Sequence, residues 1–315
     1  MNASLKFAGF TVGLAAVFGL ALGAGDAFGP EDAAPTDTHD TSTHDAAPVS
    51  ASGSPVADQT PGGLMVTDRG YTLALDTAQI LAGADLPLRF RILDADGAPV
   101  TRYVESHDKQ LHLIAVRRDM AGFQHVHPVL DAAGTWSVPL DLSRAGAYRV
   151  FADFTPDGGD GLTLGADLQV GGAYDPRPLP PVAAAAVVDG YTVTLDGVLQ
   201  PGQASKVTLA VSRDGQPVTD LQPYLGAYGH LVALRAADLG YLHVHPDGHP
   251  GDGVTAPGPG IDFFITTPSA GDYRLFLDFQ HDGVVRTAEF TLTAGQIPGA
   301  AVPAASEPMP AGHGH

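Results

Sequence analysis

The sequence predicts an all-β protein built from two tandem immunoglobulin-like antiparallel β-sandwiches. Glycine and proline are abundant, at 39 and 26 of 315 residues, which suits many short strands joined by turns. Apolar and polar residues alternate with a period of two in short runs, as they do in strands that bury one face. The same series of runs occurs twice along the chain, which indicates an internal duplication.

The predicted strands of the two copies correspond in order. The first copy contains the runs YTLAL, LRFRIL, LHLIAV and YRVFADF, and the second contains YTVTL, VTLAV, HLVAL and YRLFLDF. Residues 96–128 align without a gap on residues 214–246, and HVHP occurs in both. We therefore expect one sandwich over residues 63–170 and another over 183–294, joined by a proline-rich linker at 171–182.

The chain ends are predicted to lie outside the sandwiches. Lys6 precedes an apolar run from Phe7 to Ala24, so residues 1–27 are expected to form an apolar helix, either a signal peptide or an N-terminal membrane anchor. Either alternative places the rest of the chain outside the cytoplasm. Residues 28–62 are rich in Pro, Ala, Asp, Thr and Ser and are predicted to be a disordered linker, and 295–315 a disordered tail that ends in histidine.

Composition excludes several functions. The formal net charge of -19 argues against binding nucleic acid or anionic lipid, because both demand a basic surface. The absence of cysteine excludes disulfides, thiolate zinc sites and a blue-copper centre. There is no G-x-S-x-G, phosphate-loop or H-E-x-x-H motif, so no enzymatic activity is predicted.

The strongest functional pattern is histidine spacing. His125 and His127 lie two positions apart in a strand and so project from the same face. Folding the preceding segment about the Asp119–Met120 bond places His112 opposite His127. We therefore expect three imidazoles to meet in the first copy.

The second copy keeps this spacing. His230, His243 and His245 correspond to the three histidines of the first copy. Asp153 and Asp278 lie within apolar strands, in FADF and FLDF, and could support each cluster as ligands or as partners of a ligand. The predicted metal residues are therefore His112, His125, His127, Asp153, His230, His243, His245 and Asp278, and nitrogen ligands of this kind suit copper or zinc.

Two alternatives remain open at this point. The histidines could be structural, holding turn backbones in an interaction protein that presents its loops to a protein or glycan. The clusters could also serve a histidine-ligated oxygenase or hydrolase, which would need an open coordination position and an apolar pocket. The sequence identifies no such pocket.

The segment KQLHLIAVRRDMAGFQHVHP and the later YRVFADF resemble a group of bacterial, largely actinobacterial, exported proteins. These look akin to YtkA-like and CopC-like immunoglobulin-fold modules associated with extracytoplasmic copper handling. The resemblance covers the first copy from about Leu64 to Val170. The second copy departs from it where Ala227 replaces Lys109. It implies a cupredoxin/CopC-like sandwich and a role in handling metal.

The function predicted from the sequence is binding of copper or zinc outside the cytoplasm, as a buffer, carrier or sensor. The expected partners are the metal ion and a membrane or exported metal-handling protein, with no nucleic acid. The alternative is an exported immunoglobulin-like scaffold in which the histidine clusters are structural.

Overall fold

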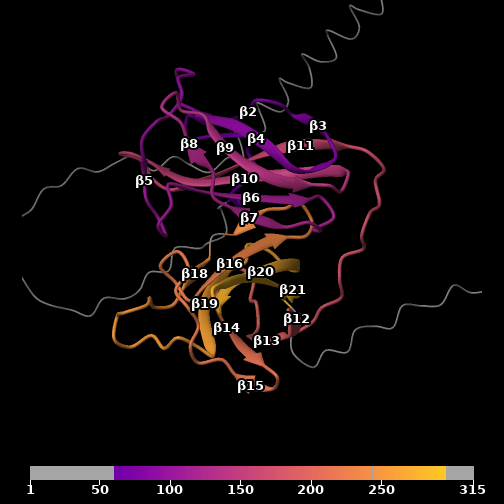
Figure 1. The fold of residues 1–315 in the computed structure, drawn as a ribbon, viewed down its shortest axis with the longest axis vertical. Coiled ribbons are helices and arrows are strands. Elements are labelled where there is room, and N and C mark those ends of the chain that lie inside the picture. The colour runs from indigo at the N-terminus through magenta and orange to yellow at the C-terminus, as the bar shows by residue number, and fades with distance from the viewer. Residues whose placement is uncertain (1–59, 243, 296–315) are drawn as a thin grey trace, which may run out of the picture. The chain divides into compact units, whose positions relative to one another are not determined.

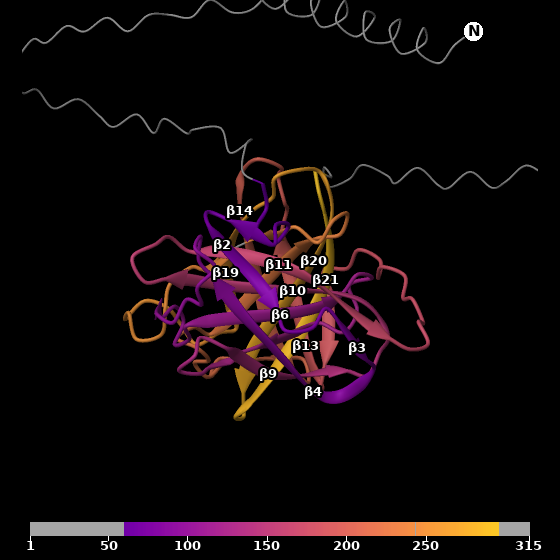
Figure 2. The same cartoon turned by 90° about the horizontal axis from the view of Figure 1, so that it is seen from above.

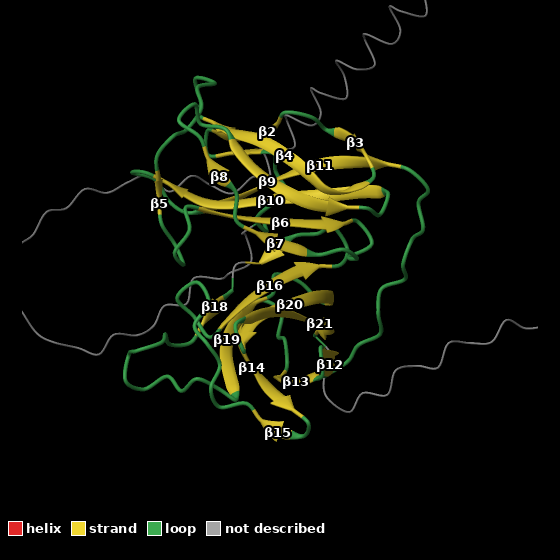
Figure 3. Cartoon of the chain, viewed as in Figure 1, coloured by secondary structure: helices red, strands yellow, loops and turns green. Residues whose placement is uncertain are grey.

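The computed structural model describes residues 60–242 and 244–295, and these residues form strands, turns and loops without a helix (Figures 1 and 3). The described part therefore contains no helix that could cross a membrane. The predicted apolar helix over residues 1–27, most of the 28–62 linker and the tail after residue 295 lie outside the described residues. All described residues belong to one compact unit.

The first sandwich consists of two sheets of five and six strands. One has the order β1-β2-β4-β9-β8, and the other has the order β3-β11-β10-β6-β7 with β5 paired to β10. The strands are β1 (Thr67–Asp68), β2 (Tyr71–Leu75), β3 (Gln79–Leu81), β4 (Gly83–Leu93), β5 (Tyr103–Val104), β6 (Leu111–Arg117), β7 (Gln124–Val126), β8 (Val129–Leu130), β9 (Trp136–Leu142), β10 (Gly146–Pro156) and β11 (Leu162–Gly171). Strands β2, β4 and β9 can be followed from above in Figure 2.

The second sandwich repeats this plan. Its sheets have the orders β12-β13-β14-β19-β18, with β15 paired to β14, and β17-β16-β20-β21. The strands are β12 (Ala185–Val188), β13 (Tyr191–Gly197), β14 (Ala204–Arg213), β15 (Gln216–Pro217), β16 (Gly229–Arg235), β17 (Tyr241–Leu242), β18 (His245–Pro246), β19 (Gly260–Thr266), β20 (Gly271–His281) and β21 (Val284–Ala294). The predicted all-β architecture with two repeated domains is confirmed.

The connectivity is that of an immunoglobulin-like sandwich. In each repeat the chain crosses several times between two sheets whose strands pair antiparallel, except that β3 joins β11 in parallel at the edge of the first repeat. Both repeats also contain the tyrosine corner of this fold. Tyr148, at the start of β10, donates from its hydroxyl to the Arg144 carbonyl at 2.9 Å, and Tyr273 of β20 donates to the Ser269 carbonyl at 2.8 Å.

Each sandwich has its own core because its outer strands alternate as the sequence predicts. In β4, Leu88, Phe90 and Ile92 are buried while the arginines between them face outward. Strand β14 does the same with Val207, Leu209 and Val211. Trp136 fills the first core, where its indole nitrogen donates to the Tyr103 hydroxyl at 3.2 Å.

Four inner strands do not alternate, because both of their faces are covered. Strands β6 and β16 are buried at nearly every position, and β10 and β20 are buried on both faces in their middle part. One face of each packs in its own sandwich, and the other contributes to a third apolar cluster shared by the two repeats. That cluster is made of Ile114, Val116, Met120, Phe151, Val232, Leu234, Leu239, Tyr241 and Phe276. We call this shared surface the junction.

Polar and aromatic contacts also cross the junction. The ring of Phe123 stacks on that of Phe276 with centroids 3.9 Å apart. Arg118 donates to the carbonyls of Ala236 and Ala237 at 3.4 and 2.6 Å. The junction therefore joins the repeats through apolar packing and hydrogen bonds together.

The chain just before the first sandwich also belongs to the junction. Gly62 accepts a hydrogen bond from the Tyr241 amide at 2.9 Å, although the sequence assigned this residue to the linker. The backbone passes this closely because Gly63 has a φ of 72°, and a Cβ there would lie 2.2 Å from the ring of Phe151. Composition predicted only flexibility for this stretch because it lacks large apolar side chains.

Candidate metal centre

The hairpin of β6 and β7 brings the first histidines together. Its register pairs Ile114 with His125 and Leu113 with Val126, so His112 and His127 follow as the next opposed pair. This is the register expected from folding about the Asp119–Met120 bond. Asp119 fixes the turn by accepting from the Arg117 guanidinium at 2.8 and 2.7 Å. Met120 adopts a positive φ of 65° at the turn.

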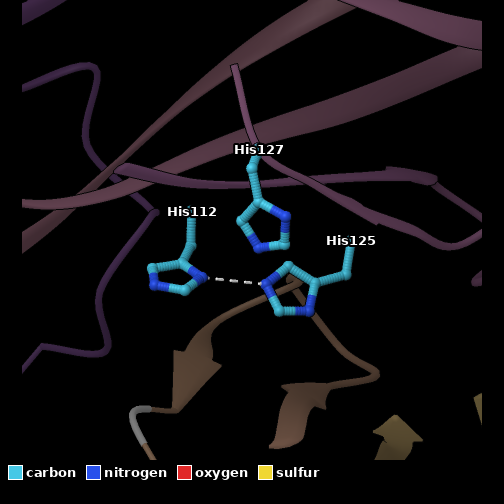
Figure 4. Close-up of side chains that lie close together, drawn as sticks. All are labelled: His112, His125 and His127. Atoms are coloured by element: carbon cyan, nitrogen blue, oxygen red, sulfur yellow. Dashed lines mark hydrogen bonds between the residues drawn. The ribbon is translucent and has the colours of Figure 1, made fainter. Parts of the chain in front are cut away.

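His112, His125 and His127 form one compact group, which we call the His cluster (Figure 4). Each ring offers a nitrogen, and these nitrogens all lie within 4.8 Å of one another. Nδ1 of His112 lies 3.1 Å from Nε2 of His125. The ring centroid of His127 lies 5.1 Å from that of His112 and 4.9 Å from that of His125. The rings therefore converge from two neighbouring strands on a common centre.

The outer nitrogens of two rings are held by oxygen atoms. Nε2 of His112 donates to the Ser106 carbonyl at 3.0 Å, and Nδ1 of His125 donates to Oδ2 of Asp278 at 2.8 Å. Because these oxygens accept, the hydrogens belong on the outer nitrogens and the facing nitrogens carry lone pairs. Two lone pairs 3.1 Å apart need a cation between them, either a proton or a metal ion.

His127 adds a third nitrogen that is buried and unsatisfied. Among the residues that the structure describes, its Nε2 has no hydrogen-bond partner. A buried polar atom of this kind costs about 1–3 kcal/mol unless something binds it. It is therefore an unexplained donor or acceptor at the centre of the His cluster.

Burial favours the neutral form of His112 and of His127. It lowers the pKa of His112 to about 4, although the hydrogen bond to Ser106 opposes the shift. Burial, together with the neighbouring His125 and His112, lowers the pKa of His127 to about 3. Neutral imidazole is the form that ligates metal, so two of the three rings are ready to bind an ion at neutral pH.

The second repeat supplies the carboxylate. Asp278 lies in the middle of β20, and its side chain and that of His125 are only 6% and 5% exposed. Its other oxygen, Oδ1, accepts from the Thr287 hydroxyl at 2.6 Å. The sequence assigned Asp278 to its own repeat, whereas the structure places it against a histidine of the first. The reason is that the face of β20 carrying Asp278 packs at the junction.

The remaining predicted ligands lie outside the His cluster or are not described, although the ring of His230 lies only 6.4 Å from that of His125. Asp153 is not part of the His cluster; it accepts from the hydroxyls of Thr163 at 3.0 Å and Tyr241 at 3.3 Å. His230 donates through Nε2 to the Tyr224 carbonyl at 2.7 Å, and burial lowers its pKa to about 4. His243 lies outside the described residues, as does the side chain of His245, so the predicted second cluster stays a prediction.

One histidine near the His cluster was assigned by the sequence to a loop. The ring of His107 lies 6.2 Å from that of His112 and 5.2 Å from that of His230. It occupies a tight turn with a positive φ of 52°. His107 has no histidine counterpart in the second copy, so the duplication gave no reason to choose it.

A groove leads to the His cluster from the first repeat. It has a volume of about 550 Å³ and is lined by His107, Lys109, His112 and Asp153, among others. His112 is thus the member of the His cluster that lines this groove, and the groove leads to the rings past polar side chains.

The solved structures to which the chain is similar include two bacterial adhesins. The FdeC adhesin of Escherichia coli is 16% identical, with a TM-score of 0.25 over 73% of this chain and 65% of that one. The adhesin InvE of Yersinia pseudotuberculosis is 12% identical, with a TM-score of 0.23 over 74% and 60%. The chain spans less than two thirds of the length of either structure. Likenesses at this level carry no argument about function.

No curated protein matches the chain significantly. A family model does match, once in each repeat, over residues 65–171 and 186–296. Together the two matches cover more than half of the sequence, and the chain therefore belongs to the family described as domain of unknown function DUF8832.

Proposed function

We propose that this protein binds a transition-metal ion, Cu(II) or Zn(II), through His112, His125 and His127. The observation that carries the proposal is a set of three ring nitrogens within 4.8 Å of one another. Two of them, on His112 and His125, face each other, and each of these rings donates its hydrogen from its other nitrogen to an oxygen outside the cluster. The role is one of binding and not of catalysis. The resemblance to CopC-like copper modules supports the same proposal.

The distances suit such an ion. Two nitrogens held at about 2.05 Å from a tetrahedral ion lie about 3.3 Å apart. The observed separation of 3.1 Å between Nδ1 of His112 and Nε2 of His125 needs only a small expansion to reach this value. His127 then finds a partner for its buried Nε2.

The chemistry of the donors favours copper or zinc over harder cations. Imidazole suits both ions, whereas calcium and magnesium prefer oxygen ligands. The hydrogen bond between His125 and Asp278 is the arrangement that raises the basicity of a ligating histidine. The strongly acidic chain would also concentrate cations near its surface.

The cellular setting is part of the proposal. The apolar run after Lys6 supports export, either as a secreted protein or as one held at the cell membrane. Outside the cytoplasm, a site with no thiolate is protected from oxidation of its ligands. We propose that it serves there as a buffer, carrier or sensor, exchanging its ion with a membrane or exported metal-handling protein.

The test is a competition titration of the whole chain with Zn(II) and Cu(II) against a chromophoric chelator. The matched variant is His127→Phe, which keeps a planar ring but removes the unpartnered nitrogen. We expect the wild type to hold one more tightly bound ion per chain than the variant. The histidines near the chain ends are present in both proteins and cancel in the comparison. Equal stoichiometry and affinity would reject the proposal.

A second function has one observation in its favour. The junction is a continuous apolar cluster that joins the repeats without any ion. In that case the protein is an immunoglobulin-like scaffold, and the histidines only fill the polar end of the junction. The variant His127→Phe also decides between the two functions. If His127 is purely structural, its replacement should lower the stability of the ion-free protein, whereas replacing an unsatisfied ligand should raise it.

A further inference from the structure

We propose that the second repeat is part of the metal centre, with Asp278 as a positioning residue for His125, and that the bound ion latches the two repeats together. The inference rests on the proposed function and adds a partner and a form of regulation to it. The sequence predicted one separate site in each repeat, whereas the described contacts make one site from both.

The carboxylate is held in a fixed place. In the strand register, Asp278 of β20 lies opposite His230 of β16 on one side and opposite Thr287 of β21 on the other, so its strand has a neighbour on both sides. One oxygen accepts from Thr287 and the other from His125, at 2.6 and 2.8 Å. A carboxylate with both oxygens occupied cannot rotate freely, and it therefore sets the orientation of the His125 ring.

The contact is well placed to sense an ion. His125 would bind the ion through Nε2 and already donates through Nδ1 to Asp278. An ion on Nε2 withdraws electron density from the ring, which makes the Nδ1 hydrogen a stronger donor to the carboxylate. The link between His125 and Asp278 is therefore stronger in the ion-bound protein than in the free one.

Reciprocity turns this link into a latch. If Asp278 raises the affinity of the His cluster for the ion, the ion must strengthen the docking of the second repeat by the same factor. The apolar junction, with Phe123 stacked on Phe276, supplies the ion-independent part of this docking. The ion strengthens the polar contact between His125 and Asp278, which lies next to this packing.

The duplication provides a matched control for Asp278. Asp153 occupies the same place in β10 of the first repeat, directly opposite His112 in the strand pairing. It also accepts from the threonine across the hairpin, Thr163. Asp153 makes no hydrogen bond to His125, whose Nδ1 donates to Asp278. The charge of Asp153 also acts on the nearby His112. Removing it therefore perturbs the His cluster through charge alone and leaves the hydrogen bond of the latch in place.

The experiment compares Asp278→Asn with Asp153→Asn in the whole chain. In the Zn(II) competition titration we expect Asp278→Asn to weaken binding by about 10- to 100-fold, and Asp153→Asn by no more than about threefold. Unchanged affinity in Asp278→Asn, or equal loss in both variants, would overturn the inference. If the wild type and His127→Phe bind Zn(II) alike, both the proposed function and this inference are rejected.

Hydrogen exchange supplies a readout that a merely structural aspartate would not move. On adding Zn(II) to the wild type, we expect slower exchange in β20 of the second repeat as well as in β6 and β7 of the first. In Asp278→Asn at saturating Zn(II), the protection should be confined to β6 and β7. If Zn(II) slowed exchange only in β6 and β7 of the wild type, the ion would not latch the repeats.

Discussion

The two hairpins that carry the histidines share a positioning device and differ in what surrounds it. In the first repeat, His112 donates to the carbonyl of Ser106, the first residue of a tight turn. In the second, His230 donates to the carbonyl of Tyr224, the first residue of the corresponding turn. Both turns have two residues of positive φ in their middle. The duplication has therefore kept the feature that fixes the tautomer of this histidine.

The differences lie in the side chains of those turns. The first turn presents His107 and Lys109 where the second has Leu225 and Ala227. The first repeat thus surrounds its rings with further nitrogen and charge, whereas the second supplies Tyr224, whose ring lies 6.3 Å from that of His127. The backbone framework is therefore duplicated, while the chemistry at the junction is divided unequally between the copies.

The largest effect is expected where the repeats pack. Phe276 is fully buried and stacks on Phe123 with an angle of 4° between the rings, while its counterpart Phe151 meets Tyr241 at 5.8 Å and 37°. Phe276→Ala should lower the free energy of unfolding by about 3–5 kcal/mol. Phe151→Ala should cost less, because it loses no close stacking. Urea unfolding of both variants measures this. Equal losses would show that the two sides of the junction contribute alike, and a larger loss in Phe151→Ala would contradict the prediction.

The next effect is a dependence of stability on pH in the ion-free protein. Unfolded histidines take up protons below pH about 6.5. The folded rings of His112 and His230 stay neutral to about pH 4, and that of His127 to about pH 3. The unfolded state therefore binds more protons between these limits, and stability must fall as the pH drops from about 6.5 to 4.

We expect a loss on the order of 2 kcal/mol over this window, after allowing for the solvent that still screens these rings. Urea midpoints measured with a chelator present from pH 7 to pH 4 test it. His127→Phe is the control, since it lacks the ring with the lowest pKa and should show a shallower slope. A stability that is flat over this range in the wild type would contradict the prediction.

The sequence was enough to predict most of the fold and the arrangement of the first three histidines, but not the contact between the repeats at Asp278. The sandwiches, the duplication and the register that opposes His112 to His127 all follow from strand period and turn position, which are local properties. The contact of Asp278 with a histidine of the other repeat could not be predicted in this way. The alternation of apolar and polar residues indicates which face of a strand is buried, but not which part of the chain covers it. The uninterrupted apolar runs LIAV, and VFA within YRVFADF, were the sequence signal of strands covered on both faces. The copper or zinc ion and export stay predictions.

The smallest effect should come from making the first turn more like the second. The positive charge of Lys109 contributes to the lowered pKa of His127, so it also repels a cation bound there. Lys109→Ala, which copies Ala227, should raise the affinity for Zn(II) by about two- to threefold and change stability by less than about 0.5 kcal/mol. The gain should shrink at high salt, since screening already weakens this repulsion. Titration at low and high ionic strength measures it, and weaker binding in the variant would instead make Lys109 a residue that supports the site.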